Sequence, residues 1–214
     1  MRKLLIIDDT LANKISFYHL LLLLVSLPFD YFFSHIIIAS YAIHLLIHFK
    51  KSDVKPILTL RMLALQSVFL VTLIATIYSS YKPLAFNDMG RQLVILILPI
   101  LFCIGPLDIK KYRDQLLQVF ALCCTLTVIY LYIHALYLLR YFHYPIKLLF
   151  SHAFTNHNFS ETIGMHATFF SLQLGIALMA LLVILLKEKH NTLVYTHERQ
   201  LNLKIKTNRD NQPL

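Results

Sequence analysis

Residues 116–139 read LLQVFALCCTLTVIYLYIHALYLL, the longest apolar block of the chain and the stretch that decides its fold. The block carries no Lys, Arg, Asp or Glu, and it exceeds the ~20 residues that a helix needs to cross a ~30 Å hydrocarbon layer. Inside lipid every backbone polar group needs a partner within its own segment, so the block must be a helix. Five more apolar blocks lie at residues 15–28, 31–49, 62–79, 88–105 and 167–186. We therefore predict an all-α integral membrane helical bundle of about six transmembrane helices.

The lysines and arginines divide unevenly between alternate gaps of these blocks. Sixteen of the 20 cations lie on one side and four on the other. Cationic loops resist translocation, so the cation-rich side is cytoplasmic and holds both termini. The outer side then has a tight turn at Pro28, a loop near residues 80–87 and a long loop near 140–166. The inner cations are Arg2, Lys3, Lys14, Lys50, Lys51, Lys55, Arg61, Lys110, Lys111, Arg113, Lys187, Lys189, Arg199, Lys204, Lys206 and Arg209, and the outer ones are Lys82, Arg91, Arg140 and Lys147.

The apolar blocks and their gaps form one transmembrane domain, residues 1–189. Residues 190–214 are polar, basic and aperiodic, which predicts a disordered cytoplasmic tail. The first apolar run follows a basic start but is not followed by a small-x-small cleavage site, so we expect an uncleaved first span. Pro28 favours a tight helical hairpin between the first two blocks, and Pro99 predicts a kink in the fourth.

The composition argues against several classes of function. The formal net charge is +9, but the positive-inside bias explains it, and the chain has no basic stripe that would indicate nucleic-acid binding. Its three cysteines all lie inside apolar blocks and suggest neither a disulfide framework nor a thiol–metal site. We expect no cofactor. A carboxylate inside a span would favour a transporter, but Asp30, Asp88 and Glu161 all fall at block boundaries or in loops.

Arg91 is the first candidate for a functional residue, because it lies about one turn inside the fourth block. A charge at that depth is costly, and ionisable residues inside membranes are functional candidates by default. Arginine forms bidentate bonds with phosphate, so Arg91 could bind an anionic lipid headgroup or a diphosphate at the outer end of this helix. The alternative is that Arg91 only snorkels to the headgroup layer.

Histidines are numerous, eleven in all. Those within spans are expected to make hydrogen bonds between helices rather than to bind ligands: His19, His35, His44 and His134. Three others share the outer loop, His152, His157 and His166. Their spacings of five and nine residues fit no helix face, and we predict no metal site there. Anchoring at the membrane interface is the plainer role for His166.

Five short elements follow one another along residues 15–186. They are a leucine-rich span that breaks at Leu27-Pro28-Phe29, a second span that runs into Lys50-Lys51, a third that ends at Tyr78-Ser79, Arg91-Gln92-Leu93 ahead of a Leu-rich segment with Pro99, and His166-Ala167-Thr168-Phe169-Phe170-Ser171 at the start of the last span. Their order resembles the N-terminal half of the O-antigen ligase family, especially its Bacteroidetes-type members. Ala167 stands where that family usually has Pro, and Phe169 where it has Tyr.

The resemblance implies a multi-pass protein of the bacterial inner membrane. Such ligases transfer a glycan from an undecaprenyl-diphosphate carrier to lipid A–core or another acceptor outside the membrane. Arg91 and His166 carry over as substrate-binding residues, and no catalytic residue does, because the family's essential arginines and histidine lie mostly in later spans that this chain is expected to lack. The expected partners are membrane lipids and an undecaprenyl-diphosphate-linked glycan. The alternatives are a non-catalytic membrane scaffold or fragment, and a small transporter subunit.

Overall fold

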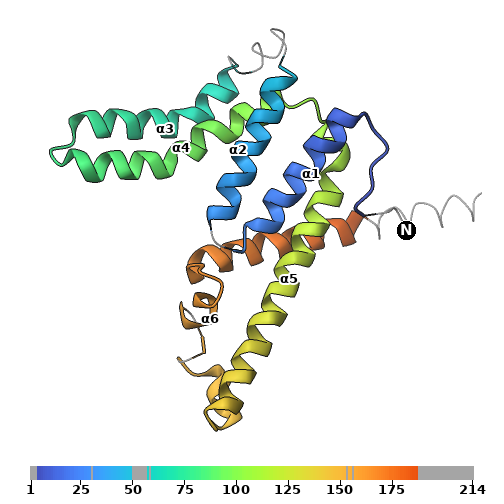
Figure 1. Cartoon of the computed structure of the whole chain (residues 1–214), viewed down its shortest axis with the longest axis vertical. Coiled ribbons are helices and arrows are strands. Elements are labelled where there is room, and N and C mark those ends of the chain that lie inside the picture. The colour runs from blue at the N-terminus through green and yellow to red at the C-terminus, as the bar shows by residue number, and fades with distance from the viewer. Residues whose placement is uncertain are drawn as a thin grey trace, which may run out of the picture. The chain divides into compact units, whose positions relative to one another are not determined.

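The computed structural model describes residues 4–29, 31–49, 57, 59–152, 154–155 and 157–187. Within these ranges every regular element is a helix and none is a strand, which confirms the all-α prediction. The chain divides into two compact units, Met1–Ser26 with Tyr31–Ile109, and Leu27–Asp30 with Lys110–Leu214. The helices are α1 (Leu11–Ser26), α2 (Tyr31–Ile47), α3 (Leu60–Tyr78), α4 (Lys82–Ile104), α5 (Ile109–Tyr141), the short 3-10 helix η2 (Ile146–Phe150), α6 (His157–Glu161) and a last helix, Ala167–Lys187 (Figure 1).

Helices α1 and α2 of the first unit pack against each other as a hairpin. Near the turn, Ser26 Oγ and Ser34 Oγ share a hydrogen bond of 2.9 Å. Farther from the turn, His44 Nε2 lies 3.1 Å from Ser16 Oγ. In an apolar setting these polar contacts are specific links between helices. The tight hairpin predicted at Pro28 is confirmed.

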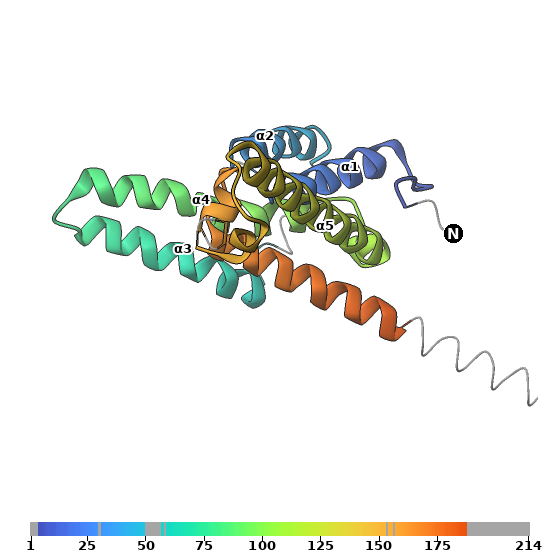
Figure 2. The same cartoon turned by 90° about the horizontal axis from the view of Figure 1, so that it is seen from below.

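Helices α3 and α4 form the second hairpin of this unit, and they lie side by side in both views (Figures 1 and 2). Thr72 Oγ1 donates a hydrogen bond of 2.6 Å to Gln92 Oε1 across the pair. At the turn, the Lys82 ammonium donates to the backbone carbonyls of Thr76 and Ile77. The last carbonyls of a helix lack partners within it, so this cation satisfies two of them at the C-terminus of α3.

Helix α4 begins earlier than the sequence predicts. The expected block started at residue 88 after a loop near 80–87, whereas the helix starts at Lys82. Pro83 lies in its first turn, where the fixed φ of proline fits a helix and its missing N–H is not needed. The predicted loop at 80–87 is therefore wrong, and the connection between α3 and α4 is only residues 79–81. Pro99 lies inside α4 without ending it, and the kink expected there stays a prediction.

In the second unit, α5 and the last helix run antiparallel. The end of the last helix contacts the start of α5, and the start of the last helix lies against the second half of α5. Lys187 Nζ donates a hydrogen bond of 2.6 Å to Asp114 Oδ2, joining the end of the last helix to the start of α5. Farther along α5, Leu131 forms a buried cluster with Ile163 and Phe170. The chain between the two helices thus folds back over the second half of α5.

Among the residues that the structure describes, four helices are long and apolar enough to cross a membrane, namely α3, α4, α5 and Ala167–Lys187. Helices α1 and α2 are apolar but shorter, at 16 and 17 residues. Large apolar side chains cover much of the exposed surface, and in α4 only Leu101 is buried. Such a surface suits contact with lipid and is rare on soluble proteins. The count of six spans stays a prediction. The tail at 190–214 and the cationic gap at 50–56 lie outside the described residues.

Candidate functional site

Arg91 lies on the exposed surface of α4, where its side chain is 74% exposed. Its Nη1 atom is 3.7 Å from Oδ1 of Asp88, one turn earlier on the same helix. That distance makes an ion pair rather than a hydrogen bond, so Asp88 does not hold the guanidinium in a bidentate contact. The pair offsets part of the cost of placing either charge in an apolar helix.

Asp88 lies inside a helix rather than at its start, because α4 begins at Lys82. This helix is apolar enough to cross a membrane, and Asp88 pairs with a cation on it. The expectation that no span carries a carboxylate stays a prediction, because the first turns of a helix can lie outside the lipid layer. The spacing of three residues could have shown the pair, since such residues share a helix face.

His166 immediately precedes the last helix and caps its start. Its Nδ1 atom accepts a hydrogen bond of 3.4 Å from the backbone N–H of Thr168, and its carbonyl accepts from the N–H groups of Phe169 and Phe170. A neutral imidazole that accepts at Nδ1 carries its proton on Nε2. The exposed ring of His166 can therefore donate a hydrogen bond to an anion through Nε2.

His157 lies against His166, although the sequence spacing did not indicate it. The two rings meet edge to face with centroids 4.4 Å apart and an interplanar angle of 73°. His157 begins α6, and the turn after α6 brings the two histidines together. Among the described residues no three side chains of His, Cys, Asp or Glu lie close enough to hold a metal ion.

A small cavity of about 310 Å³ lies beside this histidine pair, between α6 and the start of the last helix. Three hydroxyl-bearing residues line it, and the rest of the wall is apolar. One of them, Ser160, is buried. The lining residues are Phe159, Ser160, Ala167, Thr168, Phe170, Ser171 and Leu174.

The two residues singled out from the sequence fall in different units. Arg91 belongs to the first unit and His166 to the second. Within the first unit, Arg91 has Asp88 as its ionic neighbour. Within the second, His166 has His157 and Phe169 as ring neighbours, at centroid distances of 4.4 and 5.9 Å.

The histidines of α1 and α2 form a cluster inside their hairpin. His44 is buried, and its Nε2 contacts both Ser16 Oγ and the carbonyl of Ala12. His19 Nε2 lies 3.0 Å from Ser40 Oγ, and its ring stacks on that of His44 at 5.6 Å. The prediction that histidines in spans bond between helices is confirmed for His19 and His44. His134 instead lies 3.4 Å from Thr162 in the loop after α6, and for His35 the role stays a prediction.

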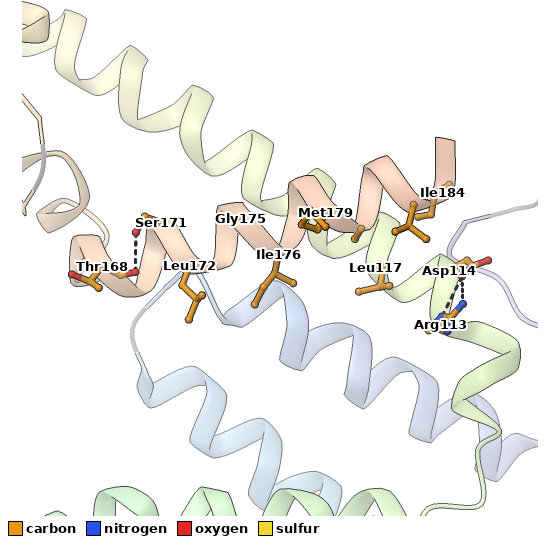
Figure 3. Close-up of a pocket in the computed structure, with 12 residues that line it drawn as sticks. Arg113, Asp114, Leu117, Thr168, Ser171, Leu172, Gly175, Ile176, Met179 and Ile184 are labelled. Carbon is orange, nitrogen blue, oxygen red and sulfur yellow. Dashed lines mark hydrogen bonds and ion pairs between the residues drawn. The ribbon is translucent and has the colours of Figure 1, made fainter. Parts of the chain in front are cut away.

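A groove of about 830 Å³ runs along the last helix, and no sequence pattern predicted it. Arg113 and Asp114 lie at one end and Thr168 and Ser171 at the other, and apolar side chains of the last helix lie between them (Figure 3). Within its own unit, only residues of α5 and of the last helix line it.

The four long apolar helices in the described part of the chain, with their widely exposed apolar side chains, indicate a membrane protein of the all-helical class. Comparison with known protein families, with curated proteins and with solved structures finds no match.

Proposed function

We propose that the chain is a multi-pass protein of the bacterial inner membrane, with six spans and both termini in the cytoplasm. The contact between Asp114 and Lys187 supports this arrangement. It puts the start of α5 and the end of the last helix on one side, and the distribution of cations assigns both of these ends to the cytoplasm. The α1–α2 and α3–α4 hairpins also fit this topology, because each short connection lets two successive helices cross the membrane in opposite directions.

At its outer face the protein binds a lipid-linked diphosphate, the donor class used by the O-antigen ligases that its sequence resembles. One observation carries this proposal: Arg91 exposes most of its side chain from a helix that is apolar enough to cross a membrane. Near the headgroup layer the local dielectric is lower than in water, which strengthens pairing with phosphate. Asp88 lies 3.7 Å from Nη1, too far for a hydrogen bond, so it leaves the planar fork of the guanidinium open to a phosphate.

The pair of His157 and His166 would also bind a phosphate group of a lipid-linked diphosphate. A neutral His166 donates through Nε2, and a phosphate oxygen accepts such a bond. Its neighbour His157 adds a second imidazole at the same place. In a complete transfer reaction a base would activate the acceptor and an arginine would stabilise the departing diphosphate. We assign Arg91 and His166 only to binding.

A non-catalytic membrane scaffold is the second candidate, and the α3–α4 hairpin favours it. Of the residues of α4 only Leu101 is buried, and α3 buries only Met62, Gln66, Phe69 and Thr76. Helices with this much exposed surface could serve chiefly to contact other membrane proteins.

Binding of an undecaprenyl-diphosphate analogue to the purified full chain in detergent separates these candidates. We expect saturable binding to the unmodified protein, and clearly weaker binding to Arg91→Lys, because lysine cannot form the bidentate contact. Arg140→Lys is the matched control, since Arg140 is another exposed arginine on the predicted outer side. Equal binding by the Arg91→Lys and Arg140→Lys variants, or no binding by a folded unmodified protein, would contradict the proposal.

A further inference from the structure

The groove along the last helix has an apolar wall that faces outward. Leu172, Ile176, Met179 and Val183 line it, with 62, 49, 61 and 54% of their surface exposed. Residues three or four apart on a helix lie on one face, so these side chains make a continuous strip. Leu117 of α5 adds an apolar contact near the charged end.

One end of this strip is rich in cations. Arg113 lines the groove there, and Lys187 lies beside it through its hydrogen bond to Asp114. Two cations, Arg113 and Lys187, therefore meet one carboxylate, Asp114, at this end. Asp114 is already bonded to Lys187 and contacts Arg113 at 3.4 Å, so this end of the groove keeps an excess of positive charge.

Gly175 hollows the middle of the strip. A Cβ atom built on it meets no atom within 4 Å, so the glycine is not required by close packing between helices. Glycine inside a helix costs about 1 kcal/mol relative to alanine in water. From Ile184 to Gly175 the helix rises about 14 Å at ~1.5 Å per residue. That is roughly half of the ~30 Å hydrocarbon layer, the depth of one leaflet.

We propose that this groove binds an anionic phospholipid, with its phosphate at Arg113 and one acyl chain along the last helix as far as Gly175. The apolar strip matches the chain in character and length, and the cationic end matches the headgroup in charge. The site is separate from the proposed outer-face ligand, because Arg113 lies at the opposite end of α5 from the histidine loop.

Native mass spectrometry of the full chain in mild detergent tests the headgroup. Phosphatidylglycerol and phosphatidylcholine with the same acyl chains are titrated against the protein. We expect phosphatidylglycerol to bind more tightly. Arg113→Gln should weaken its binding about fivefold, the factor equivalent to the ~1 kcal/mol that one cation near an anionic lipid contributes. Arg61→Gln removes one exposed charge on the same predicted side and should leave binding unchanged.

Gly175→Leu tests whether an acyl chain binds in the groove, and it leaves every charged residue unchanged. The new side chain would fill the groove, so phosphatidylglycerol should bind hardly better than phosphatidylcholine. Gly90→Leu is the matched control, because a Cβ at Gly90 also meets nothing within 4 Å and lies on another apolar helix. Equal binding of the two lipids to the unmodified protein would overturn the proposal. It would also be overturned if folded Gly175→Leu, judged by its thermal melting, bound phosphatidylglycerol as well as Gly90→Leu does.

Discussion

The carboxylate of Asp88 and the guanidinium of Arg91 lie 3.7 Å apart on successive turns of α4. Both side chains are exposed, by 52 and 74%. The carboxylate lowers the cost of a cation in an apolar helix, and it also competes with any anionic ligand for the same guanidinium. Its removal should therefore act on ligand binding and on the stability of the helix in opposite directions.

Asp88→Asn should tighten binding of the undecaprenyl-diphosphate analogue. An exposed ion pair contributes about 0.2–1 kcal/mol, so the gain should not exceed about fivefold. Titration of the purified variant beside the unmodified protein measures it. Asp8→Asn, which removes an exposed carboxylate near the N-terminus on the predicted cytoplasmic side, is the control and should change nothing. Weaker binding by Asp88→Asn would show that the carboxylate orients the arginine rather than competing for it.

His44→Leu should destabilise the α1–α2 hairpin. The change leaves the Ser16 hydroxyl without its 3.1 Å contact and removes a contact with the Ala12 carbonyl, both within the hairpin. Hydrogen bonds between membrane helices are worth about 0.6–2 kcal/mol, which sets the expected loss. His48→Leu is the control, because the ring of His48 is exposed and bonds only one turn back, to the His44 carbonyl. Thermal unfolding in detergent should show the larger loss for His44→Leu, and equal losses would refute the role given to the buried histidine.

Two glycines should respond in opposite directions to alanine. A Cβ at Gly105 would lie 2.9 Å from the Tyr41 hydroxyl and 3.3 Å from the Leu101 carbonyl, so Gly105→Ala must displace Tyr41. Tyr41 is buried and hydrogen-bonds Ser16, so we expect a loss of about 1 kcal/mol. Gly90→Ala meets no atom and gains helix propensity, so it should stabilise by up to about 1 kcal/mol. Melting temperatures of the two variants that shift in the same direction would contradict this account.

The ion pair between Asp114 and Lys187 should make stability depend on pH in the acid range. The hydrogen bond from Lys187 holds the pKa of the Asp114 carboxyl below its ordinary value. A carboxyl whose pKa is lower in the folded state stabilises that state above its unfolded pKa of about 4, and loses this effect as pH falls through the folded value. Both partners are partly exposed, so Asp114→Asn should cost less than about 1 kcal/mol at neutral pH. The difference from the unmodified protein should vanish at the lowest pH at which both stay folded, and a difference that persists there would exclude the ion pair as its cause.

Apolar blocks predicted where helices lie, but not where they begin. The block at 116–139 became α5, which extends over Ile109–Tyr141, because charged residues outside a lipid layer are tolerated in a helix. The hydropathy pattern indicates the apolar segment that would lie in the membrane, but it does not indicate the solvated turns that continue the helix beyond it. The same effect moved the start of α4 to Lys82 and took Asp88 from a boundary into the helix.

Contacts between distant segments had weaker signals in the sequence. The distribution of cations assigned Asp114 and Lys187 to the same side of the membrane, so their ion pair could have been predicted from the sequence. The His157–His166 contact was not, because it depends on the turn after α6, where Gly164 has a φ of +67°. The hydrogen bond from Gln173 Nε2 to the Leu27 carbonyl joins residues 146 positions apart, and no periodicity indicates it.

Membrane topology is the central claim, because the proposed outer site requires α4 and the last helix to have their ligand-binding ends outside. Reporter fusions after Asp108, Asn158 and Asn202, with a phosphatase active only in the periplasm and a fluorescent protein active only in the cytoplasm, measure it directly. The account predicts phosphatase activity for Asn158 and fluorescence for Asp108 and Asn202. Fusions at Asn158 and Asn202 that report the same side would contradict it.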